Sequence, residues 1–257
     1  MYLPGFNLEG KTALVTGAGK GIGRALAIGL AEAGADVMLV SRTLSDLESV
    51  AQEITGLTGR RAYPITANVG VREDVTAAVE EAVRLAGRID VLVNNAGMNI
   101  RTPALEVTED EWDVIVQTNL KSAFLMSQTV GRHMKEHGSG RIVNVASVGG
   151  HVALRTGVVY GTTKAALVHM TRILAMEWGK HGILVNAIGP WYFHTPLTEK
   201  LLANEAFMTE VVGRTPLGRI GQLEELVGPV VFLASDASSY VTGQTLYVDG
   251  GMTIYGF

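Results

Sequence analysis

The sequence predicts a single α/β domain, a doubly wound Rossmann fold whose seven-stranded parallel sheet is flanked by helices. Three observations lead to this prediction. Short apolar runs alternate with segments of helical periodicity, and strands separated by helices pair in parallel through right-handed crossovers. No linker interrupts the 257 residues, so we expect one domain over 1–257. A glycine-rich turn joins the first strand to the first helix, as is typical of this fold.

The first half of the chain alternates regularly between strands and helices. Its strands are predicted from short apolar runs, and its helices from apolar residues recurring every three or four positions. In chain order we expect a strand at 11–16, a helix at 22–33, a strand at 36–40, a helix at 44–54, a strand at 62–66, a helix at 73–86 and a strand at 89–93.

The second half continues the alternation with longer helices. We expect a helix at 109–137, a strand at 141–146, a helix at 158–180, a strand at 183–188, a helix at 223–234 and a strand at 244–248. Residues 190–213 instead mix aromatic residues and proline with a short helical pattern. This stretch is predicted to form a lid over the edge of the sheet.

The composition narrows the functions to be considered. A formal net charge of −4 gives no basic surface for a nucleic acid or an anionic membrane, so we expect neither partner. The absence of cysteine excludes disulfides, thiolate nucleophiles and cysteine-ligated zinc. His133 and His137 could share a helix face, but no third ligand is evident, so we expect no metal site. With no leader pattern or membrane-length apolar run, we expect a cytoplasmic protein.

The glycine-rich turn is the first motif that carries chemistry. Glycines let the backbone turn sharply and approach a pyrophosphate, whose charge the helix N-terminus favours. An ordinary turn also uses glycine, but the position between a strand and a helix favours a dinucleotide site. The expected contacts are Thr16, Gly17, Gly19, Lys20, Gly21, Ile22 and Gly23.

A second motif, Asn94-Asn95-Ala96-Gly97, ends the fourth predicted strand. The carboxyl ends of parallel strands line the ligand crevice of such folds, so Asn95, Ala96 and Gly97 are predicted to contact the cofactor. By itself, the motif is also compatible with a simple asparagine turn.

A third group of residues indicates proton transfer. Tyr160 and Lys164 are four apart on one helix face, and an adjacent cation lowers the pKa of a phenol by favouring phenolate. Tyr160 can then exchange a proton with an alcohol oxygen while hydride leaves or arrives. Ser147, at the end of a strand, could hold that oxygen by a hydrogen bond. Asn119 is a polar residue within the long predicted helix. Each residue also has an ordinary structural explanation, but the combination is harder to dismiss.

The chain resembles the short-chain dehydrogenase/reductase family over nearly its whole length. The resemblance is carried by Thr16–Gly23, Asn94–Gly97, Asn119, Ser147 and the Tyr160–Lys164 segment, in this order and spacing. It implies that Ser147 positions the substrate and that Tyr160 is the acid/base. It also implies that Lys164 binds the ribose and tunes Tyr160, that Asn119 anchors a water-linked relay to Lys164, and that the protein is a homotetramer.

Two positions depart from the pattern of the family. Pro190 and Thr195 fit its cofactor contacts, but Trp191 stands where glycine is expected, which puts the local backbone and the room for substrate in question. Asn68, followed by Val69, stands where an aspartate often faces the adenine, and an amide can still form a hydrogen bond there.

The residues after the second strand bear on the choice of cofactor. An acidic residue there would bind a ribose diol and select NAD. This chain has Ser41 and Arg42 instead, with Lys20 in the glycine turn, so we expect NADP, with NAD as the alternative. Both cations could also be solvated surface charges.

For the substrate, the chain resembles the gluconate 5-dehydrogenase-like sugar-acid dehydrogenases of this family. Arg101 and Arg155 are predicted to hold a carboxylate, and Trp191 and His194 to shape the pocket with Ser147. The alternative is that both are ordinary surface arginines with no role in binding, which is the commoner situation for such residues. A 3-oxoacyl-[acyl-carrier-protein] reductase would share the catalytic residues but needs a basic surface for its carrier, and no decisive patch is seen. A non-catalytic dinucleotide sensor is disfavoured because Ser147, Tyr160 and Lys164 are intact.

Overall fold

The computed structural model, which describes residues 5–155 and 157–255, confirms the predicted fold class. Seven parallel strands form one sheet in the order β3-β2-β1-β4-β5-β6-β7. The strands are β1 (Thr12–Thr16), β2 (Asp36–Ser41), β3 (Ala62–Thr66), β4 (Val91–Asn94), β5 (Gly140–Val145), β6 (Ile183–Pro190) and β7 (Thr245–Val248). The strand order reverses between β1 and β4, which creates a crevice at the carboxyl ends of the strands.

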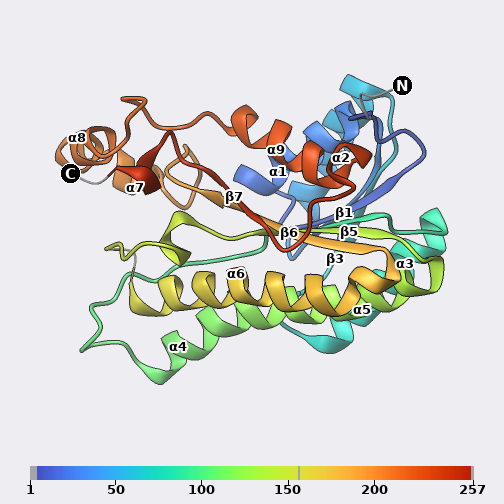
Figure 1. The fold of residues 1–257 in the computed structure, drawn as a ribbon, viewed down its shortest axis with the longest axis horizontal. Coiled ribbons are helices and arrows are strands. Elements are labelled where there is room, and N and C mark those ends of the chain that lie inside the picture. The colour runs from blue at the N-terminus through green and yellow to red at the C-terminus, as the bar shows by residue number, and fades with distance from the viewer. Residues whose placement is uncertain (1–4, 156, 256–257) are drawn as a thin grey trace.

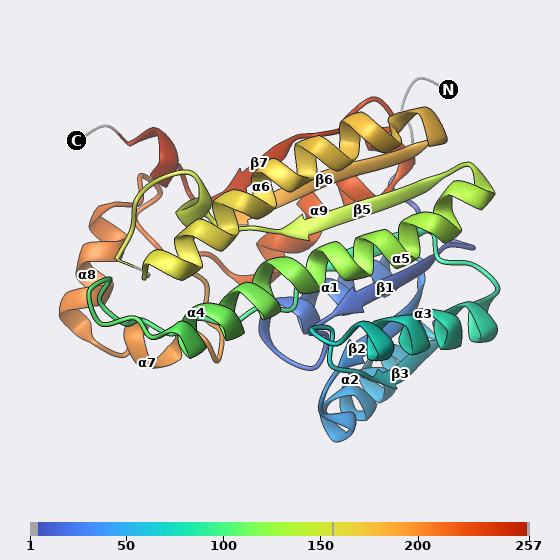
Figure 2. The ribbon, with the colours of Figure 1, turned by 90° about the horizontal axis from the view of Figure 1, so that it is seen from below.

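Helices cover both faces of this sheet, as Figures 1 and 2 show. One face carries α1 (Gly21–Glu32), α2 (Leu44–Thr58) and α9 (Val227–Ala234). The other carries α3 (Arg72–Ala86), α4 (Glu109–Val116), α5 (Ser122–His137) and α6 (Val158–Trp178). Two further helices, α7 (Glu199–Leu202) and α8 (Glu205–Gly213), lie at one end of the molecule in the predicted lid region (Figure 1). No helix within the described residues is both long enough and apolar enough to cross a bilayer.

The central strands are apolar on both faces because helices cover both. Ala13 and Val15 of β1 pack in the layer beneath α1, α2 and α9, while Leu14 between them packs in the opposite layer with α3 and α5. Successive side chains of a strand point to opposite faces, so a strand between two layers of helices must be apolar throughout. This explains why the strands read as continuous apolar runs in the sequence.

The helical segment predicted over 109–137 is confirmed in its bounds, but it is not a uniform α-helix. The segment consists of α4 and α5 joined by a π-helical turn at Gln117–Lys121. No Gly or Pro marks this change, so apolar periodicity alone could not reveal it. Such single π turns often occur at functional sites, and this one contains Asn119.

Smaller differences affect the ends of other predicted helices. The α-helical part of 158–180 ends at Trp178 and continues as a 3₁₀ turn over Gly179–His181. The predicted helix at 223–234 begins with a 3₁₀ turn, Leu223–Leu226, before α9. Helix ends often tighten in this way, because their last backbone groups lack partners within the helix.

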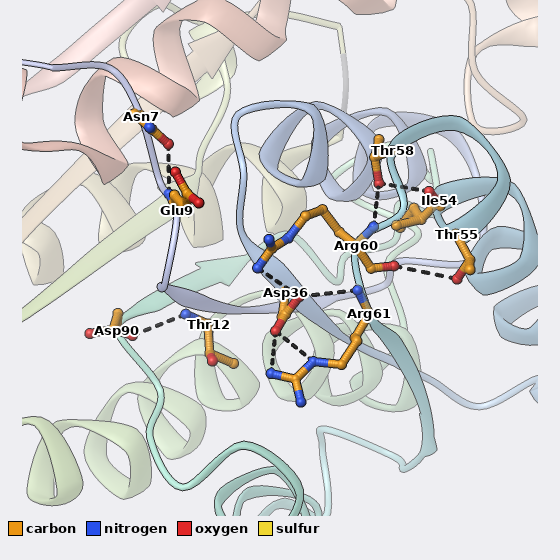
Figure 3. Close-up of polar contacts among 10 residues, drawn as sticks. All are labelled: Asn7, Glu9, Thr12, Asp36, Ile54, Thr55, Thr58, Arg60, Arg61 and Asp90. Carbon is orange, nitrogen blue, oxygen red and sulfur yellow. Dashed lines mark hydrogen bonds and ion pairs between the residues drawn. The ribbon is translucent and has the colours of Figure 1, made fainter.

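A charge cluster stabilises the edge of the sheet at which the strands begin (Figure 3). Asp36, the first residue of β2, is buried and accepts hydrogen bonds from the backbone N–H of Arg61 at 3.0 Å and from its Nη2 at 2.6 Å. Nη2 of Arg60 lies 3.0 Å from the same carboxylate. Burial alone would raise the pKa of Asp36, but the hydrogen bonds from Arg61 and the two positive charges lower it below its ordinary value of 3.8.

We expect Asp36→Asn to lower the free energy of unfolding by about 2 kcal/mol at neutral pH, because it removes the carboxylate charge that binds Arg60 and Arg61, and hydrogen bonds to charged groups are worth about 1.5–3 kcal/mol. The folded-state pKa is depressed, so the carboxylate stabilises the protein above the unfolded pKa, and this contribution is lost as the pH falls through the folded value. Urea unfolding of both proteins, at neutral pH and at about pH 3, measures the effect. The two stabilities should converge in acid. Glu81→Gln, which removes an exposed ion pair with Arg84, is the control and should change nothing measurable.

Candidate active site

A cleft of about 720 Å³ opens at the carboxyl ends of the strands. Most of the predicted site residues line it, namely Gly17, Gly19, Lys20, Gly21, Ile22, Ser41, Arg42, Asn68, Val69, Asn95, Ala96, Gly97, Ser147, Tyr160, Lys164, Pro190, Trp191 and Thr195. Six other predicted residues are not part of its lining, namely Thr16, Gly23, Arg101, Asn119, Arg155 and His194. The fold therefore brings the glycine turn and the tyrosine–lysine pair, which are distant in sequence, to one cleft.

The glycine turn allows a close approach of phosphate groups. Gly17 has a φ of +64°, and a Cβ there would lie 2.9 Å from Nδ2 of Asn95. A Cβ at Gly23 would lie 2.2 Å from the carbonyl oxygen of Gly17 and would push the turn away from α1. Lys20, the cap residue of α1, makes no side-chain cap hydrogen bond, and the first turn of the helix holds no acidic residue. The free backbone N–H groups at the N-terminus of α1 can therefore bind an anion, and the pyrophosphate of a dinucleotide is such an anion.

The two asparagines at the end of β4 have different roles. Asn95 fixes the glycine turn, since its Nδ2 donates to the carbonyl oxygen of Thr16 at 2.9 Å and its backbone N–H donates to Oγ1 of Thr16 at 3.0 Å. Asn94 is buried, and its Nδ2 donates to Oγ of Ser127 and to Oδ1 of Asn144, each at 2.9 Å. The motif therefore ties the glycine turn to the centre of the sheet, which a simple asparagine turn would not do.

Ser147 and Tyr160 meet in the cleft although they come from different elements. Ser147 follows β5, and Tyr160 lies in the first turn of α6. Both side chains line the cleft, and Ser147 acts on the pKa of Tyr160. Oγ of Ser147 accepts the backbone N–H of Gly149 at 3.0 Å, which fixes the orientation of the serine. Two hydroxyl groups are thus presented together, as is needed to hold and protonate one substrate oxygen.

The expectation that Lys164 lowers the pKa of Tyr160 is wrong for the protein alone. Burial raises the pKa of Tyr160 above its ordinary value, and the interaction with Ser147 and the charge of Arg101 offset this only in part. Nζ of Lys164 lies 5.6 Å from the centre of the tyrosine ring. An oxidised nicotinamide bound beside Tyr160 would supply a further positive charge that favours phenolate.

Lys164 is a buried cation beneath the cleft. Its Nζ donates to the carbonyl oxygen of Val145 at 2.8 Å, and burial lowers its pKa to about 8. Desolvation penalises an ammonium that has too few acceptors. The hydroxyls of a bound ribose would supply such acceptors, so Lys164 fits a nucleotide that enters this cleft.

Asn119 projects from the π-helical turn, where it is buried. Its Oδ1 accepts the backbone N–H of Met98 at 2.7 Å, while its Nδ2 donates to the carbonyl oxygen of Met98 at 2.9 Å and to Oγ1 of Thr163 at 3.3 Å. A Cβ on Gly97 would lie 3.4 Å from Oδ1 of Asn119 and 3.7 Å from Nζ of Lys164. The two side chains therefore flank one glycine, and the water-linked relay between them stays a prediction.

The end of the cleft near β2 contains a residue that sequence reasoning missed. Lys20, Ser41 and Arg42 line it as predicted, and Asp46 of α2 lies with them. Oδ2 of Asp46 is 3.0 Å from Nζ of Lys20. The prediction considered only the residue that ends the second strand, whereas this carboxylate comes from the following helix. The available signal was an acidic residue in the first turn of a helix that starts beside the crevice.

Trp191 lies in the wall of the cleft and does not need the backbone of a glycine. No residue other than glycine has a positive φ in the described part of the chain. The indole Nε1 donates to Oγ1 of Thr215 at 3.0 Å, and the ring packs edge-on against Tyr192. Trp191 therefore joins the cleft to a small apolar core, which consists of Tyr192, Leu202, Val211 and Ile220. Phe193 also lines the cleft and was not predicted.

The other predicted substrate residues do not converge. His194 is exposed and lies outside the lining of the cleft, because side chains alternate along the extended segment in which Trp191 and Phe193 face inward. Arg155 forms an ion pair with Glu210 of α8. Nη1 of Arg101 donates to the carbonyl oxygen of Arg155 at 3.4 Å, and the charge of Arg101 acts on Tyr160. Of the two arginines, Arg101 is the one coupled to the proton-transfer residue.

His133 and His137 stack on each other, with ring centres 4.3 Å apart. Nε2 of His133 accepts the backbone N–H of Ile89 at 3.4 Å, and burial lowers the pKa of this histidine. These contacts give the pair a structural role. Among the described residues, no group of three His, Cys, Asp or Glu side chains is placed to hold a metal.

The fold and the site define a class of protein, the dinucleotide-binding oxidoreductases, and the comparisons with known proteins narrow it. A family described as enoyl-(acyl carrier protein) reductase matches residues 17–253. Gluconate 5-dehydrogenase of Gluconobacter oxydans is 45% identical over 97% of both chains. The structure of a gluconate 5-dehydrogenase from Burkholderia cenocepacia with NADP and tartrate superposes with a TM-score of 0.94 at 40% identity, covering 97% of both chains. A 3-oxoacyl-[acyl-carrier-protein] reductase of Thermotoga maritima is 41% identical over 96% of this chain and 99% of its own. This chain belongs to the short-chain dehydrogenase/reductase family.

Proposed function

We propose that this protein is an NADP-preferring dehydrogenase/reductase that interconverts a secondary alcohol and a ketone on a sugar acid. The observation that carries the proposal is the meeting of Ser147, Tyr160 and Lys164 in a cleft whose glycine turn suits a dinucleotide. The bound nicotinamide would carry the hydride. Ser147 holds the substrate oxygen, and Tyr160 gives or takes its proton.

The preference for NADP is supported by charge. Lys20 and Arg42 both line the end of the cleft near β2, and no acidic residue ends that strand. Two cations favour a 2′-phosphate over a free ribose hydroxyl. The related gluconate 5-dehydrogenase from Burkholderia cenocepacia binds NADP in its structure.

The choice of a sugar acid is supported by Arg101. Within the described residues it makes no ion pair with a carboxylate, whereas Arg155 is bound to Glu210. A guanidinium near the proton-transfer residue can hold a substrate carboxylate through two parallel hydrogen bonds. The similarity to gluconate 5-dehydrogenase of Gluconobacter oxydans supports the same class of substrate.

The remaining parts of the proposal concern assembly and location. Residues 190–213 act as the lid of the single catalytic domain, and their helices share a small core with Tyr192 and Ile220. A cytoplasmic homotetramer fits the family. Exposed apolar side chains on α4, α5 and α6 provide surface for contacts between subunits, namely Trp112, Phe124, Ile173 and Met176.

The experiment is a comparison of kcat/KM for reduction of 5-ketogluconate and of an acetoacetyl thioester with NADPH. We expect the keto acid to be the better substrate. The opposite preference would favour a 3-oxoacyl-[acyl-carrier-protein] reductase, an activity that the relative from Thermotoga maritima brings into consideration. No reduction of any carbonyl compound would contradict the proposed reaction.

Arg101→Met, tested with the same substrates, examines the carboxylate site. We expect kcat/KM for the keto acid to fall by roughly 10- to 100-fold, because a charge-assisted hydrogen bond is worth about 1.5–3 kcal/mol. Activity on the thioester, which has no carboxylate, should change little. Arg155→Met is the matched control, because this arginine is already paired with Glu210. An equal loss in both variants would argue against a specific role for Arg101.

A further inference from the structure

Asp46 lines the end of the cleft near β2, the end at which dinucleotide folds of this type bind the adenosine ribose. Its carboxylate lies 3.0 Å from Nζ of Lys20, and both residues line the cleft together with Ser41 and Arg42. A Cβ added to Gly19 would lie 2.9 Å from Cβ of Asp46, so the aspartate packs directly against the glycine turn. This end of the cleft therefore holds one carboxylate and two cations.

We propose that Asp46 limits the preference for NADP and supports the use of NAD, a role that rests on the proposed dinucleotide cleft. A carboxylate accepts hydrogen bonds from ribose hydroxyls and repels a 2′-phosphate. In dinucleotide folds of this type an acidic residue ending the second strand has that role. Here the second strand ends in Ser41, and the acidic group reaches the same end of the cleft from the first turn of α2.

Lys20 and Asp46 differ in how far their side chains are exposed. The side chain of Lys20 is 66% exposed and that of Asp46 is 26% exposed, so the ion pair between them is a weak surface pair. Lys20 can therefore turn toward a phosphate at little cost. Asp46 stays in place, because Gly19 packs against it and the N-terminus of α2 favours a negative charge. The negative charge of Asp46 therefore faces whichever cofactor is bound and disfavours a 2′-phosphate. The positive charges of Lys20 and Arg42 favour that phosphate and so oppose the effect of Asp46.

The decisive measurement is the binding of two fragments that differ only in the 2′-phosphate, adenosine 2′,5′-bisphosphate and 5′-AMP, by titration calorimetry. The quantity of interest is the ratio of the Kd for 5′-AMP to the Kd for the bisphosphate. In Asp46→Asn, which keeps the shape of the side chain, we expect this ratio to rise on the order of tenfold, as removal of a like charge at contact range allows. The ratio of kcat/KM for NADPH to that for NADH should rise in parallel.

Two further variants make the result specific. Lys20→Ala should lower the binding ratio, because it removes an attraction for the phosphate. Glu48→Gln removes the same charge from the same helix at an exposed position outside the cleft, and should leave the ratio unchanged. An unchanged ratio in Asp46→Asn, or an equal rise in Glu48→Gln, would overturn the role of Asp46 alone. Failure of the wild-type protein to bind either fragment would overturn the dinucleotide cleft itself, and the proposed function with it.

Discussion

Tyr160→Phe is expected to lower kcat for carbonyl reduction by about a thousandfold while the affinity for NADP stays close to that of the wild type. The phenol is the only group of this side chain that can exchange a proton, and general acid–base catalysis contributes typically 10²–10⁴-fold. The aromatic ring, which fills its place beside Ser147, remains. Steady-state kinetics with 5-ketogluconate measures the first effect, and calorimetric titration with NADP measures the second.

Tyr240→Phe is the matched control for this experiment, because Tyr240 is fully exposed and its hydroxyl lies on the surface. It should behave as the wild type in both measurements. A Tyr160→Phe protein that retains most of its activity would show that another group transfers the proton, and the assignment of Tyr160 would then be wrong. A parallel loss of NADP binding would instead indicate that the cleft had been disturbed.

Lys164→Met is expected to stabilise the cofactor-free protein and at the same time remove its activity. The cost of burying this ammonium appears in its pKa, which falls from 10.5 to about 8. That difference corresponds to about 3 kcal/mol, which an apolar side chain of similar length would not incur. The activity is expected to be lost because the variant has no cation beneath the cleft to hold the ribose hydroxyls of the cofactor beside Tyr160. An increase in the free energy of unfolding when Lys164 is removed would show that this residue is kept for function although it destabilises the fold.

The pH dependence of stability distinguishes two reasons why Lys164→Met could be more stable. One is the removal of a buried ammonium, and the other is better packing of the methionine side chain. Because the folded-state pKa of Lys164 lies below its unfolded value, the unfolded chain holds more protons between the two, and the wild type gains stability as the pH rises through this range. Lys164→Met lacks this gain. The stability difference should therefore shrink to roughly half between about pH 7 and pH 9.5, as measured by urea unfolding without cofactor. Lys180→Met, at an exposed position, should show no such convergence. A constant difference for Lys164→Met would mean that desolvation of the ammonium is not the cause.

Much of the candidate site was predictable because its residues belong to local patterns. The glycine turn lies between a strand and a helix, and Tyr160 and Lys164 share a helix face, so their positions follow from secondary structure alone. The carboxyl ends of parallel strands then bring these segments to one edge of the sheet. The interruption of the helix at Asn119 was not predictable, because a π turn leaves the apolar periodicity on both sides nearly unchanged.

The sequence by itself determined the fold, the dinucleotide turn and the proton-transfer residues, since each depends on a period of two or 3.6 residues or on a short motif within one connection. Only the tertiary structure decided which charges meet. It placed Asp46 against Lys20, paired Arg155 with Glu210, and directed His194 away from the cleft. Such contacts join side chains from separate elements, and their partners depend on how whole helices pack rather than on any spacing along the chain.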